Sequence, residues 1–118
     1  MAKIHDNLVQ NTKDHMRPSR YRSIESTLEY DTGKYAGEFD VLGIAKSGVW
    51  HYYECKSHYT HDAYSRALKQ FSRCAKAFPN REWKFIFVSS EYVGIVRLDN
   101  PWPQYVHDQL SKRKPSYN

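Results

Sequence analysis

Two carboxylates and a lysine suited to metal-assisted phosphate chemistry lie close together in this sequence. Asp40 ends the run Gly37-Glu38-Phe39-Asp40, and a short run, Glu54-Cys55-Lys56, follows it. Mg²⁺ prefers oxygen ligands and is usually held by one or two carboxylates, together with water and substrate phosphate. A nearby ammonium group can hold the attacking water or the phosphate, while the metal lowers the pKa of bound water. These residues predict phosphodiester hydrolysis if the fold brings them together.

A β-hairpin is the element that must position these side chains. Residues 38–45 and 49–57 have the composition of strands, and the loop Lys46-Ser47-Gly48 between them suits a three-residue hairpin turn. If Ala45 closes the hairpin against Val49, Asp40 faces Glu54 and Glu38 faces Lys56. Side chains directly opposed in this way lie about 4.5–5.5 Å apart at Cβ. We therefore expect two carboxylates in contact on one face, where their repulsion calls for a cation.

Hydrophobic periodicity predicts the remaining elements. They are a helix over 4–15, a strand over 23–30, a helix over 62–78 with Thr60 as N-cap, a strand over 83–89, a further edge strand over 92–98, and a short helix opening at Asn100 before a basic tail. The fold class expected is α/β, with a mixed central sheet flanked by helices in the order α-β-β-β-α-β. We expect a single domain over residues 1–118, with its core over about 5–98 and the C-terminal helix and tail over 100–118.

This order of elements, with Asp40 on one strand and Glu54-Cys55-Lys56 on the next, resembles the PD-(D/E)XK nuclease superfamily and its restriction-endonuclease-like core. The resemblance covers roughly residues 5–90. It implies that Asp40, Glu54 and the backbone carbonyl of Cys55 hold Mg²⁺, for which Mn²⁺ can substitute. It also implies that Lys56 and Gln70 join the two carboxylates as candidate catalytic residues. Alternation along the strand directs the Cys55 thiol to the opposite face.

The sequence departs from the family pattern in its first helix, where many members carry a glutamate that completes the metal site. The polar and ionisable residues that this helix offers are His5, Asp6, Asn11, Asp14 and His15. Further candidate ligands are Glu38, Glu25 and Asp6. The alternative is that the hairpin carboxylates and Lys56 form an exposed ion-pair ladder without catalysis.

Charge is unevenly distributed along the chain, which carries 18 Lys and Arg against 13 Asp and Glu, a net charge of +5. Residues 25–55 hold six acidic and two basic residues, whereas residues 56–84 hold seven basic and two acidic ones. An acidic centre between basic segments suits a cation site that is surrounded by phosphate contacts. The candidate DNA-binding residues are Arg17, Arg20, Arg22, His58, Arg66, Lys69 and Arg73.

The function expected from the sequence is a Mg²⁺-dependent DNA endonuclease. Small size and the absence of a specificity domain point to the Holliday-junction resolvase-like members of the superfamily, which cut branched DNA as homodimers. A non-catalytic basic nucleic-acid-binding domain remains open, as does an RNA-directed or repair nuclease on the same scaffold. With two cysteines and no long apolar run, we expect reduced thiols, no membrane partner and a cytoplasmic location, in the host cell if the source is viral.

Overall fold

The computed structural model describes residues 2–102 and contains two α-helices and five strands. In chain order these are α1 (Ala2–His15), β1 (Tyr21–Asp31), β2 (Ala36–Ala45), β3 (Trp50–Cys55), α2 (His61–Ala77), β4 (Trp83–Val88) and β5 (Val93–Val96), with a short 3₁₀ helix, η1 (Pro18–Arg20), before β1. The expected C-terminal helix and basic tail lie largely outside the described residues. Among those described, no helix is long and apolar enough to cross a bilayer.

The five strands form one mixed sheet in the order β1-β2-β3-β4-β5. Strands β3 and β4 pair in parallel, and the other neighbours are antiparallel. Parallel neighbours need a long crossover, which α2 supplies. The expected mixed sheet flanked by helices is confirmed, and β5 extends the order to α-β-β-β-α-β-β.

The β2–β3 hairpin has the predicted register. Leu42 pairs with Tyr52 and Ile44 with Trp50. The loop closes through hydrogen bonds from the Ala45 N–H to the Val49 carbonyl and from the Gly48 N–H to the Ala45 carbonyl, both 2.9 Å. Gly48 has φ +97°, a conformation that glycine adopts at little cost.

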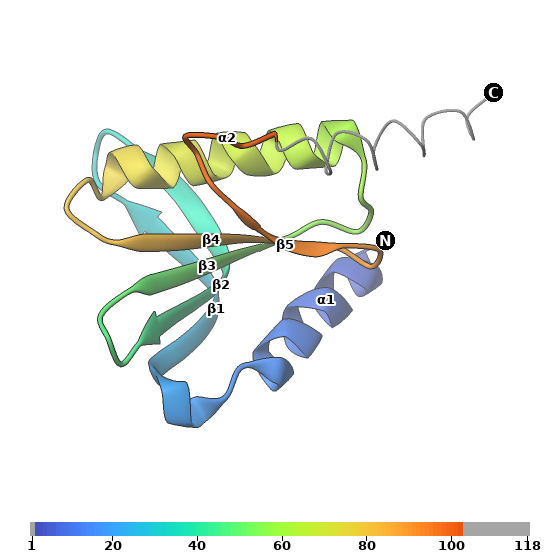
Figure 1. The fold of residues 1–118 in the computed structure, drawn as a ribbon, viewed down its shortest axis with the longest axis horizontal. Helices are drawn as coiled ribbons and strands as arrows, with labels where there is room; N and C mark the ends of the chain where they lie inside the picture. The colour runs from blue at the N-terminus through green and yellow to red at the C-terminus, as the bar shows by residue number, and fades with distance from the viewer. Residues whose placement is uncertain (1, 103–118) are drawn as a thin grey trace.

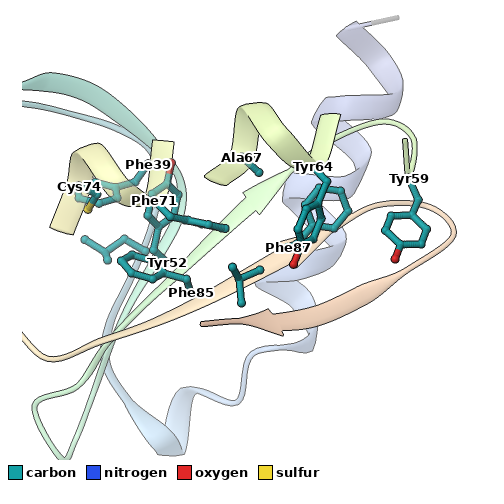
Figure 2. Close-up of a cluster of buried hydrophobic side chains, with 11 residues drawn as sticks. Phe39, Tyr52, Tyr59, Tyr64, Ala67, Phe71, Cys74, Phe85 and Phe87 are labelled. Carbon is teal, nitrogen blue, oxygen red and sulfur yellow. The ribbon is translucent and has the colours of Figure 1, made fainter. Parts of the chain in front are cut away.

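The helices cover opposite faces of the sheet, with α2 on one side and α1 on the other (Figure 1). Thr60 caps α2 as predicted, because its hydroxyl accepts a hydrogen bond from the Ala63 N–H at 3.1 Å. The α2 face carries an aromatic cluster that includes Tyr52, Phe71 and Phe85 (Figure 2). A smaller cluster of Val9, Met16, Val41, Cys55, Ile86 and Val88 lies under α1.

Replacing Phe71 with alanine should lower the free energy of unfolding by about 3–5 kcal/mol. Its fully buried ring contacts Tyr52 edge-on and stacks on Phe85, so truncation leaves a cavity in the aromatic cluster. Urea denaturation measures the loss. Leu28→Ala is the control, because Leu28 is 40% exposed and should change stability by under about 1 kcal/mol. Equal losses in the two variants would contradict this assignment of the core.

Candidate active site

Asp40 is held at the point where the regular β2–β3 pairing ends. The last regular pair is Val41 with Tyr53, and beyond it the Cys55 backbone N–H donates a hydrogen bond to Asp40 Oδ2 at 2.8 Å. His5 Nε2 of α1 lies 3.3 Å from the same oxygen. Asp40 is buried, and both of these contacts use Oδ2. Its carboxylate is therefore fixed by the neighbouring strand and by the first helix.

Glu54 is the second buried carboxylate, with 2% of its surface exposed. The Tyr52 hydroxyl donates a hydrogen bond to Glu54 Oε1, and Lys56 Nζ lies 3.3 Å from Oε2. The expected contact between Lys56 and Glu38 is therefore wrong. Lys56 follows the end of β3 and pairs with Glu54, whereas Glu38 is exposed and lies opposite Glu29 of β1.

Burial raises the pKa of Glu54 to about 7, and the negative charge of Asp40 adds to the rise. The hydrogen bond from Tyr52 and the charge of Lys56 act in the opposite direction without cancelling it. The two carboxylates thus lie close enough to repel each other in a poorly solvated place. Tyr52 and Lys56 do not fully offset the repulsion between Asp40 and Glu54, and a cation bound between the two carboxylates would relieve it.

The geometry at Asp40 includes a break in strand alternation. Phe39 and Leu42 both join the cluster under α2, although regular alternation puts residues an odd number apart on opposite faces. On β1 the regular pairing with β2 skips Thr27, which lies across from Asp40 and has φ +49°, a strained value for a β-branched residue. Such strain costs of order 1–3 kcal/mol and is concentrated at functional sites.

A cavity of about 340 Å³ adjoins the two carboxylates. Its lining includes His5, which contacts Asp40, and Lys56, which contacts Glu54. His58 and Arg66 add further positive or titratable groups from the loop after β3 and from α2. Among the described residues, no acidic side chain lines this cavity, although His58 pairs with Glu91 and Arg66 with Asp62 beside it. The lining therefore suits a phosphate placed beside the two carboxylates.

The other proposed ligands lie apart from this cluster. Glu25 is exposed and pairs with Leu42 across β1 and β2, and Asp6 is exposed beside His5. The first-helix residue that reaches Asp40 is His5, which sequence reasoning named but did not select. The sequence pointed to His5 only through its position in the predicted first helix, from which the family resemblance implies that one residue completes the metal site.

The remaining predicted residues fall into two groups. On α2, Lys69 and Arg73 are exposed beyond Arg66, whereas the side-chain oxygen of Gln70 is buried without a hydrogen-bond partner among the described residues. A buried oxygen of this kind calls for a donor such as an ordered water. Arg17, Arg20 and Arg22 lie near the hairpin loop, at the opposite end of the sheet from Asp40; the Arg22 guanidinium donates to the Lys46 carbonyl at 3.0 Å.

The donor set fits Mg²⁺ better than a transition metal. In the part of the chain that the structure describes, no three His, Cys, Asp or Glu side chains group to hold an ion. Asp40 and Glu54 would supply the one or two carboxylates that Mg²⁺ usually takes from a protein. The Cys55 thiol lies on the α1 face, 3.8 Å from the Thr12 hydroxyl, and burial raises its pKa to about 12, which disfavours a thiolate ligand.

Comparisons of the chain with protein-family models, curated proteins and solved structures find no match in any of the three. The chemistry of the site is therefore the basis for assigning a function.

Without divalent metal, the free energy of unfolding should fall by roughly 3 kcal/mol between about pH 5 and pH 8 through Glu54 alone. Because the folded-state pKa is about 7 against an ordinary 4.5, the unfolded chain gives up this proton first as pH rises. Urea denaturation in EDTA measures the change. The Glu54→Gln variant lacks an ionisable group at this position, so the difference between it and wild type isolates the contribution of Glu54 to the pH dependence. Its free energy of unfolding relative to wild type should increase with pH. Parallel pH profiles for the two proteins would contradict the raised pKa.

Proposed function

We propose that this protein is a Mg²⁺-dependent endonuclease that hydrolyses phosphodiester bonds in DNA. The observation that carries the proposal is the pair of buried carboxylates, Asp40 and Glu54, beside Lys56 and a cavity that no acidic side chain of residues 2–102 lines. The electrostatics also disfavour an exposed ion-pair ladder. Such ladders are solvated, whereas these carboxylates are buried and Asp40 helps to raise the pKa of Glu54.

Each residue of the site has a role in this proposal. Asp40 and Glu54 would hold the metal, with the Cys55 carbonyl as a third oxygen, and Mn²⁺ could replace Mg²⁺. When bound, such an ion would lower the pKa of a water molecule and neutralise charge on the phosphate. Lys56 orients the attacking water or the scissile phosphate, and the buried amide oxygen of Gln70 accepts a hydrogen bond from a water.

The phosphate contacts divide between the cavity and its surroundings. His58 and Arg66 line the cavity and would hold the phosphate that is cut or its neighbour. Lys69 and Arg73 continue the basic surface along α2, with Arg73 about 10 Å beyond Arg66 at 1.5 Å per residue. A chain this small leaves little surface for reading bases, so recognition through shape and phosphate position is the natural mode.

Asp40→Asn should lower DNA cleavage by at least roughly a hundredfold, as should Lys56→Ala, because each removes a group that stabilises charge at the reacting phosphate. Asp40→Asn should bind DNA as well as wild type or more tightly, since it removes a negative charge near phosphate. Supercoiled plasmid and a four-way junction are incubated with Mg²⁺, Mn²⁺ or EDTA, with a matched RNA as a third substrate.

The matched control for this assay is Glu82→Gln, which also removes one negative charge, from an exposed side chain outside the site. It should cleave like wild type. If the wild-type protein binds DNA but does not cut it with any divalent metal, the catalytic proposal is wrong and a basic nucleic-acid-binding domain is supported. If only the RNA is cut, the protein is an RNA-directed nuclease and the assignment of DNA as its substrate is wrong.

Junction resolution is proposed as the preferred activity, and it requires two active sites for two symmetric cuts. We expect paired, symmetric nicks in the four-way junction and little cutting of linear duplex. Light scattering should give about twice the 14.0 kDa mass of one chain. A monomer that cuts linear duplex and junction equally would contradict this preference and leave a less selective nuclease.

A further inference from the structure

A second and larger cavity, of about 730 Å³, lies on the α1 face of the sheet. It is bounded by α1, η1, the hairpin loop and β3 to β5. Helix α1 packs against β1, β2 and β3 and shares a buried cluster with Ile86 and Val88 of β4. The β5 residues on this face, Val93 and Ile95, remain exposed, and α1 lies on the opposite side of the sheet from α2 (Figure 1). The exposed side chain of Val93, 60% accessible, forms part of the rim. We call this cavity the α1 groove.

In the part of the chain that the structure describes, positive and titratable side chains line the α1 groove and no carboxylate does. The set consists of His15, Arg17, Arg20, His51 and Lys84. Within residues 2–102, no salt bridge joins any of the five to an acidic residue. Burial lowers the pKa of His51, and the charge of Lys84 lowers it further. The lowered pKa keeps His51 neutral, so the positive charge of the groove comes from Arg17, Arg20 and Lys84. These three charges have no acidic partner among the described residues, which is the pattern of a surface that receives an anion.

Aromatic and apolar groups form much of the remaining lining. The Tyr21 hydroxyl lies 2.8 Å from His51 Nδ1 and 3.1 Å from the Tyr53 hydroxyl, and the Tyr21 and His51 rings meet edge-on. Val88 and Val93 add apolar surface at the other end. A lining that combines cations with aromatic rings suits a ligand that carries both phosphates and flat bases.

The α1 groove ends beside the candidate active site. Val88 lines the groove, and its carbonyl accepts a hydrogen bond from the backbone N–H of Lys56 at 2.8 Å. Leu8 lines the same end, one helical turn from His5. Lys84 lies four residues before Val88 on β4, about 13 Å away at the rise of a strand. The charged part of the groove is therefore a few nucleotides from the phosphate that the site would cut.

We propose that the α1 groove binds an unpaired DNA strand of the substrate, next to the point of cleavage. The inference rests on the proposed nuclease function and narrows its substrate to DNA with a single-stranded arm or an opened junction strand. An intact duplex fits less well, because it presents phosphates outward and keeps its bases stacked away from the aromatic lining. The volume of about 730 Å³ is that of a pocket for a ligand of nucleotide size.

The test compares two substrates and two pairs of charge-removing substitutions. Fluorescence anisotropy in EDTA gives the Kd for a blunt duplex and for the armed DNA, which is the same duplex with a single-stranded arm. Arg20→Ala combined with Lys84→Ala should weaken binding of the armed DNA about tenfold and lower its salt slope by about 1.4, at 0.7 per phosphate contact. Binding of the blunt duplex should change little. Lys34→Ala combined with Lys76→Ala removes two exposed charges elsewhere and should leave both affinities near wild type.

A second variant, Val93→Glu, places a negative charge at the exposed rim and should also weaken binding of the armed DNA selectively. The inference is overturned if wild type binds both DNAs equally, or if the groove pair and the control pair lose the same affinity. Selective binding of the armed DNA by a protein that cuts nothing would support the groove and refute the nuclease proposal. If the groove substitutions change neither cleavage nor the affinity for the armed DNA, the nuclease proposal is supported and the groove inference is refuted.

Discussion

The hydrogen bond from the Cys55 backbone N–H to Asp40 determines the character of the candidate site. It continues the β2–β3 connection beyond the last regular pair, Val41 with Tyr53, by using a side chain in place of the backbone. Asp40 is thereby held in a buried position close to Glu54, which has Lys56 as its ion-pair partner. Burial raises the pKa of Glu54, and the neighbouring charge of Asp40 raises it further, a repulsion that the proposed metal ion would relieve.

The two faces of the sheet differ in how completely they are covered. On the α2 face, the aromatic cluster with Tyr52 and Phe71 closes the core, and Tyr52 also donates its hydroxyl to Glu54. The α1 face is covered incompletely, because Val93 and Ile95 of β5 remain exposed beside the cluster under α1. Basic side chains occupy the space that α1 leaves, including Arg20 and Lys84. A small domain can thus combine an aromatic core on one face of its sheet with a basic surface on the other.

Much of the fold was predictable because its signals are local. The loop ending in Gly48 specified a hairpin register, the apolar spacing of α2 specified a helix, and Thr60 specified its start. The break in alternation beside Asp40 was not predictable, because it depends on contacts with β1 and with α1. A regular strand model therefore placed Glu38 against Lys56, where the structure has Glu54 as the partner.

The sequence by itself determined which groups are available for chemistry: Asp40 and Glu54 near the open end of one hairpin, followed by Lys56 and a basic helix. Tertiary structure alone decided which of them are buried, that His5 reaches Asp40, and that Arg17 and Arg20 lie in a separate groove. The physical reason is the distance along the chain over which each interaction acts. Turn geometry, capping and periodicity act over a few residues, whereas desolvation and charge coupling depend on which distant segments pack together.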